Sequence, residues 1–150
     1  NRPANRFVAG FVGTPPMNFF EGQLEPNGGA THFVGRIGRV SLPRSMSDPM
    51  GTTRGQAAVF GIRPQHVLLN GGPLSSDTGD RIVIGEATVR HIEPLGDCIN
   101  VHLRTVGGES IVARIAPTIP VSPSQAVSVG LDLSYAHVFS ADDGRRLGAP

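Results

Sequence analysis

Alternating apolar and polar positions recur along most of the chain and predict a protein built mainly of β-strands. The clearest example is 127–133, where branched aliphatic residues alternate with serine, glycine and aspartate. A strand with this pattern has one buried face and one exposed face. The predicted strands are 19–25, 31–37 with a continuation at 39–40, 57–62, 82–93, 98–104, 111–115, 127–133 and 137–139.

The first residues depart from this pattern and predict a short helix followed by a linker, residues 1–16. Pro3 suits the first turn of a helix, and Gly13 suits its end. The apolar stripe of this helix consists of Phe7, Val8, Phe11 and Val12. Because so short a helix is marginal alone, we expect the stripe to dock on another surface.

Residues 17–150 are predicted to form one small β-barrel of the OB type with about five main strands. Long loops rich in Ser, Pro, Gly and Arg are expected at 41–56 and 70–80. A β-sandwich is the competing architecture, because strand spacing and turn signals suit both.

Composition narrows the classes of function. A net charge of +1 provides no overall field that would attract nucleic acid or a membrane surface. All 13 basic residues are arginine, which we interpret mainly as a coding bias, with arginine contacts to anions as the alternative. The single cysteine, Cys98, excludes an internal disulfide and is typical of a reducing compartment.

Nucleotide hydrolysis by this chain alone is excluded by its residues. A P-loop needs a lysine that reaches the terminal phosphates, and the chain contains no lysine. The paired glycines at 28–29, 71–72 and 107–108 have the spacing of turns, not of a dinucleotide-binding loop.

A hairpin across Pro94–Asp97 offers the strongest alternative chemistry. With a four-residue turn, Glu93 faces Cys98, and His91 and His102 become diagonal neighbours on the same face. Such residues could hold zinc or activate the thiol. We favour a solvated polar face, because cross-strand neighbours rarely provide tetrahedral geometry.

Residues 36–54 are locally positive, with four arginines and one aspartate. They are interpreted mainly as a solvated loop, with an acidic partner or a phosphorylated ligand as the alternative. An OB-type module for an oligonucleotide is a rival hypothesis, but such a module needs aromatic stacking platforms, and the chain has no Trp and one Tyr.

Several short motifs, in order along the chain, carry a resemblance to a known family. They are Pro-Ala-Asn-Arg-Phe-Val-Ala-Gly-Phe-Val-Gly at 3–13, Pro-Met-Asn-Phe at 16–19, Gly-Ile-Arg-Pro-Gln-His at 61–66, Glu-Pro-Leu-Gly-Asp at 93–97, Val-His-Leu at 101–103, Gly-Glu at 108–109, Val-Ala-Arg at 112–114 and His-Val-Phe at 137–139. Together they resemble the C-terminal part of MalK-like ABC-importer ATPases of the maltose, trehalose and glycerol-3-phosphate group.

The resemblance implies a TOBE/MOP-like regulatory domain that follows a nucleotide-binding domain and pairs across a homodimer. The ATP and Mg site would then lie in the rest of a longer parent polypeptide. The implied partners are a second copy, the nucleotide-binding domain, the membrane subunits of the transporter and, in some relatives, a cytoplasmic regulatory protein, but no nucleic acid. The implied location is cytoplasmic, peripheral on the inner face of the cell membrane.

The resemblance also suggests contact residues, although it implies no catalytic, cofactor-binding or metal-binding residue in this chain. Candidate regulatory or dimer contacts are Phe139, Arg63, His66, Glu93 and Gly96, and the stripe of the first helix would dock on the ATPase domain. Phe139 has an equally good alternative as an ordinary core residue. The rival functions are a free-standing OB-type module for an anion or oligonucleotide, and a metal- or thiol-dependent enzyme.

Overall fold

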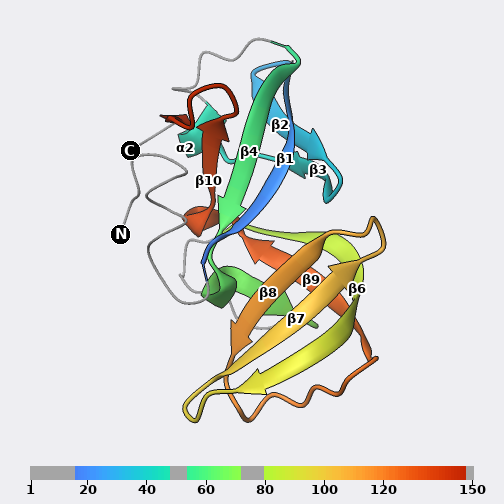
Figure 1. Ribbon diagram of the computed structural model, residues 1–150. Coiled ribbons are helices and arrows are strands. Elements are labelled where there is room, and N and C mark those ends of the chain that lie inside the picture. The colour runs from blue at the N-terminus through green and yellow to red at the C-terminus, as the bar shows by residue number, and fades with distance from the viewer. Residues whose placement is uncertain (1–15, 48–53, 72–79, 148–150) are drawn as a thin grey trace.

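The computed structural model describes residues 16–47, 54–71 and 80–147 (Figure 1). These residues contain eleven strands in two sheets, with three short helical turns. The strands are β1 (Asn18–Asn27), β2 (Ala30–Gly35), β3 (Gly38–Ser41), β4 (Gln56–Ile62), β5 (Val67–Leu69), β6 (Arg81–Pro94), β7 (Ile99–Thr105), β8 (Ser110–Ile115), β9 (Ala126–Asp132), β10 (His137–Ser140) and β11 (Arg146–Leu147). The helical turns are α2 (Arg44–Ser47) and the 3₁₀ turns η1 (Pro64–His66) and η2 (Leu133–Tyr135).

The first sheet has six strands in the order β11-β10-β4-β1-β2-β3. Every neighbouring pair is antiparallel. The chain therefore returns near its end to complete this sheet, with Phe139 on β10 opposite Val59 on β4.

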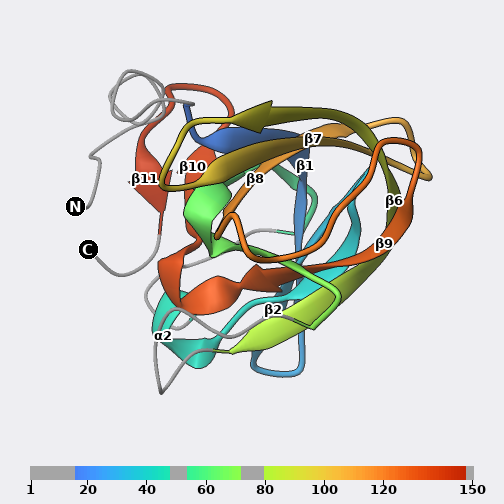
Figure 2. The ribbon, with the colours of Figure 1, turned by 90° about the horizontal axis from the view of Figure 1, so that it is seen from below.

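The second sheet has five antiparallel strands in the order β5-β9-β6-β7-β8. It curls so that its edge strands β5 and β8 contact each other (Figure 2). Irregularities in β6 between Val83 and Gly85, and between Val89 and His91, help a long strand to bend.

One continuous apolar core lies between the two sheets and extends into the curled one. Phe20, Phe33 and Phe60 come from the first sheet, and Val101 and Leu131 come from the second; all are buried. Burying a side chain of this size stabilises the fold by about 1.5–3 kcal/mol.

A smaller apolar cluster lies on the other face of β4. It contains Met17, Val59 and Phe139, and the half-buried Phe19 packs against it. Successive residues of a strand point to opposite faces, so Val59 belongs to this cluster whereas Phe60 belongs to the main core.

The structure confirms the predominance of strands and most of their predicted positions. The described residues contain more strands than the five main ones expected, and β5 and β11, with three and two residues, are too short to show a periodic pattern. Residues 38–41 form a separate strand after a turn, and the predicted loop 41–56 contains α2. The predicted first helix lies outside the described residues, and the division at residue 16 stays a prediction.

Candidate functional site: the junction of the two sheets

A buried asparagine joins the two sheets. Asn18, on β1, donates Nδ2–H to the carbonyl oxygens of Val112 (2.9 Å) and Ile62 (3.2 Å). Its Oδ1 accepts a hydrogen bond from the Val112 backbone N–H (2.8 Å). The side-chain amide therefore acts as a strand partner for β8, the edge strand of the second sheet.

A stacked aromatic pair lies where the chain crosses between the sheets. The chain crosses once through η1, between β4 and β5, and once through η2, between β9 and β10. His66 ends η1 and Tyr135 ends η2, and their rings stack with centroids 3.9 Å apart and planes within 2°. The stack thus ties one crossing to the other.

The surroundings of His66 favour its neutral form. Burial holds the pKa of His66 below its ordinary value of 6.5, and Arg63 adds to this shift, whereas the Asp132 carboxylate opposes it. Asp132 is fully buried and accepts a hydrogen bond from the Ser134 N–H (3.2 Å), which caps η2.

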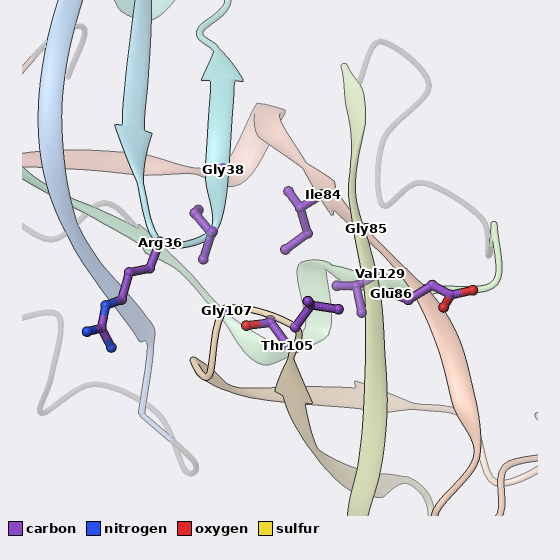
Figure 3. A pocket seen from close by; sticks show the side chains of 10 residues that line it. Arg36, Gly38, Ile84, Gly85, Glu86, Thr105, Gly107 and Val129 are labelled. Atoms are coloured by element: carbon purple, nitrogen blue, oxygen red, sulfur yellow. The ribbon is translucent and has the colours of Figure 1, made fainter.

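A small hollow opens at another part of the junction (Figure 3). It has a volume of about 200 Å³ and lies between the β2–β3 turn, the irregular part of β6 and the β7–β8 turn. Ile84 points from β6 toward β3, whereas Arg36 and Glu86 point away from the hollow. A Cβ atom at Gly107 would lie 2.9 Å from the Arg36 carbonyl oxygen, so glycine permits this close approach of the two turns.

The predicted contact residues do not form one cluster. Arg63 and His66 lie together at the junction. Phe139 is fully buried in the small cluster, where its ring meets Phe19 edge to face, with centroids 6.1 Å apart. Glu93 is exposed on β6, and Gly96 is in the β6–β7 turn with a φ of 91°.

The hairpin prediction is confirmed, but its predicted register is wrong. Glu93 pairs with Asn100, not Cys98, and His91 lies directly opposite His102, not diagonal to it. The turn is tighter than expected, because a backbone hydrogen bond closes it at Cys98 and Gly96 takes a positive φ.

The same face still carries the polar residues that the sequence indicated. The rings of His91 and His102 are 5.5 Å apart, and Glu93 Oε1 lies 3.7 Å from His102 Nε2. Glu93 also accepts a hydrogen bond from Asn100 Nδ2 (3.3 Å). Within the part of the chain that the structure describes, no group of three or more His, Cys, Asp or Glu residues could hold a metal ion.

Sequence reasoning missed three residues of the junction, namely Asn18, Asp132 and Tyr135. Asn18 lies between two apolar neighbours, directly before the predicted strand 19–25, which gave a weak sign that its amide is buried. Tyr135 stood out only as the single tyrosine, and no local pattern places it beside His66.

The fold is similar to that of a protein of known structure. The cytoplasmic molybdate-binding protein ModG superposes with a TM-score of 0.58, covering 89% of this chain and 96% of the ModG chain at 18% identity. The likeness supports the mainly β, OB-type class.

The chain belongs to the TOBE domain family, whose model matches residues 60–139. The model of the MalK OB fold domain matches residues 13–67. The predicted resemblance to MalK-like proteins is therefore confirmed.

Three relatives show which proteins contain such a region. The sulfoquinovosyl glycerol transport ATP-binding protein SmoE of Agrobacterium fabrum is 34% identical over 98% of this chain. The sn-glycerol-3-phosphate import ATP-binding protein UgpC of Chromohalobacter salexigens is 32% identical over 96%, and the trehalose/maltose import ATP-binding protein MalK of Thermococcus litoralis is 31% identical over 98%. The chain spans only 35–38% of the length of these relatives.

None of the helices, in the ranges that the structure describes, has the length and apolar character needed to cross a lipid bilayer.

Proposed function

We propose that this chain is the regulatory and dimerisation domain of the ATP-binding subunit of an ABC importer for a sugar or a related solute. The observation that carries the proposal is the match over nearly the whole chain to ATP-binding proteins of three such transporters. The MalK OB and TOBE models also match residues 13–67 and 60–139, so together they cover most of the chain.

The nucleotide chemistry would then belong to another part of the subunit. Because the chain has no lysine, ATP and Mg would bind to a nucleotide-binding domain of the same polypeptide. The partners would be that domain, a second copy of the subunit, the membrane subunits and, in some conditions, a cytoplasmic regulatory protein. The subunit would lie on the cytoplasmic side of the cell membrane.

Three parts of the chain are candidates for these contacts. Arg63 and His66 lie at the junction, where a partner would act on both sheets at once. Glu93 and Gly96 lie at the exposed end of the β6–β7 hairpin. The apolar stripe of residues 7–12 would dock on the nucleotide-binding domain.

The proposal is tested on the complete product of the gene that encodes this chain. The complete product should bind a fluorescent ATP analogue and hydrolyse ATP in the presence of Mg, whereas residues 1–150 alone should do neither. Hydrolysis by residues 1–150, or a complete product that does not bind ATP, would refute the proposal.

Partner binding and the rival function need separate measurements. The complete product should sediment as a dimer and co-purify with the membrane subunits of its transporter when they are expressed together. A titration of residues 1–150 with single-stranded oligonucleotides should show no salt-sensitive binding. Tight, salt-sensitive binding would favour the free-standing OB module instead.

A further inference from the structure

A second and larger hollow lies at the junction, between residues 41–44, where β3 leads into α2, and residues 80–82, at the start of β6. Its volume is about 380 Å³, which is within the range of small-molecule sites. Residues from both sheets line it, and they are Ser41, Leu42, Pro43, Arg44, Asp80, Arg81, Ile82 and Leu133.

The walls of this hollow combine apolar and charged groups. Leu42, Ile82 and Leu133 contribute to the main core or pack against it, so they present a fixed apolar surface. Arg44 and Arg81 are exposed and both line the hollow, so each can bring a guanidinium to a ligand bound there. A site of this composition suits a ligand with a compact carbon skeleton and an anionic group.

The arginines point to phosphate as the anionic group. Arg81 Nη1 donates to the Gly71 carbonyl oxygen (3.2 Å), which restrains the guanidinium beside the hollow. Arg44 approaches from α2, on the other sheet's side of the hollow. A phosphate has enough acceptor oxygens to accept from two separate guanidinium groups, whereas a carboxylate suits one bidentate arginine better.

Asp80 and Ser41 supply the complementary polar groups. Among the described residues that line the hollow, Asp80 carries the single carboxylate, and its oxygens could accept hydrogen bonds from ligand hydroxyls. The hydroxyl of Ser41 can either donate or accept. A polyhydroxy skeleton therefore suits the hollow better than a hydrocarbon one.

We propose that this hollow binds a small phosphorylated polyhydroxy compound, with Arg44 and Arg81 on the phosphate and Asp80 on the hydroxyls. The ligand would bridge the two sheets. Its effect would reach the stacked pair directly, because the Asp80 carbonyl accepts a hydrogen bond from Leu133 N–H (2.7 Å) at the start of η2, which ends at Tyr135.

A metabolite bound in this hollow would be a ligand of the regulatory domain, so its physiological meaning rests on the proposed function. The ligand site and the proposed function are refuted by different results. Ligand binding is measured on residues 1–150 without ATP, whereas the proposed function is tested by ATP binding to the complete gene product.

The experiment titrates residues 1–150 with glucose 6-phosphate, glucose, inorganic phosphate and glucuronate by calorimetry. Tyr135 provides a second signal, because the chain has one tyrosine and no tryptophan. Glucose 6-phosphate should bind at least about tenfold more tightly than the other three and should change the tyrosine fluorescence. No binding of glucose 6-phosphate at about 10 mM, or equal affinity for phosphate or glucuronate, would overturn the proposal.

Variants then place the ligand in the hollow. Arg44→Gln and Arg81→Gln should each weaken glucose 6-phosphate binding by about tenfold or more, and Arg44→Lys should restore part of the affinity. Arg39→Gln is the matched control, because Arg39 is exposed on β3 but does not line the hollow, and it should change the affinity by less than about twofold. Circular dichroism verifies that each variant is folded, and folded Arg44→Gln and Arg81→Gln proteins with unchanged affinity would refute the site.

Discussion

The side-chain amide of Asn18 forms two hydrogen bonds with the backbone of Val112, one in each direction. Residues 94 positions apart are thereby joined as neighbouring strands would be, at the edge of the second sheet. This link is a polar connection between two sheets that otherwise meet mainly through the apolar core. It fixes β8 relative to β1 in a way that non-directional apolar contacts cannot.

Replacing Asn18 should therefore destabilise the whole fold. In Asn18→Ala the N–H and C=O of Val112 lose their partner in a partly buried place, which costs about 1–3 kcal/mol of the free energy of unfolding. Asn18→Asp should cost at least as much, because a carboxylate cannot donate to Val112 or Ile62. Urea denaturation measures both effects. The control is Gln23→Ala, an exposed change on the same strand, and an equal loss in this control would contradict the role of Asn18.

The strands could be predicted from the sequence because their pattern is local. Val127, Val129 and Leu131 are almost completely buried, as their alternation indicated. The pairing of strands could not be predicted in the same way. β10 pairs with β4 across nearly 80 residues of chain, and nothing in the pattern of either strand identifies the other.

The candidate site was less predictable than the fold. Arg63 and His66 came from a resemblance between motifs, whereas Asn18 and Tyr135 are important only because of residues distant in sequence. The predicted register of the β6–β7 hairpin was wrong by two residues, because Glu93 pairs with Asn100 and not with Cys98. The tight turn that causes this shift depends on the positive φ of Gly96. The slip preserved the alternation of faces, which is why the polar face was predicted correctly.

Gly107→Ala should separate the turns where the sheets meet. The new Cβ would lie 2.9 Å from the Arg36 carbonyl oxygen, and backbone on both sides limits how far either turn can move. We expect a loss of about 1–3 kcal/mol in the free energy of unfolding, as for other overpacked sites.

The neighbouring residue in the same turn provides the control for Gly107→Ala. Val106 is 90% exposed, so Val106→Ala should change the stability by less than about 0.5 kcal/mol. Thermal unfolding of the two variants checks the comparison, and similar melting temperatures would show that the turns are not constrained.

Phe139→Ala distinguishes a core role from a surface contact. The side chain is fully buried against Met17 and Val59, so its removal should cost about 3–5 kcal/mol in this chain alone. Phe19→Ala is the control within the same cluster and should cost less, because Phe19 is only half-buried. A Phe139→Ala protein with unchanged stability but weakened dimerisation of the complete subunit would favour the contact role instead.

The stack of His66 on Tyr135 should make the stability of the domain depend on pH. Burial lowers the pKa of His66 in the folded chain, so the unfolded chain binds more protons between that lowered pKa and 6.5. The free energy of unfolding should therefore fall as the pH falls through 6.5 and should be recovered above it.

His66→Gln removes this contribution, so the melting temperature of the variant should fall less between pH 7.5 and 5.5 than that of the wild type. His91→Gln is the control, because His91 is exposed on the hairpin, and it should keep the pH dependence of the wild type. Identical pH profiles for the His66→Gln variant and the wild type would show that the stack does not respond to protonation.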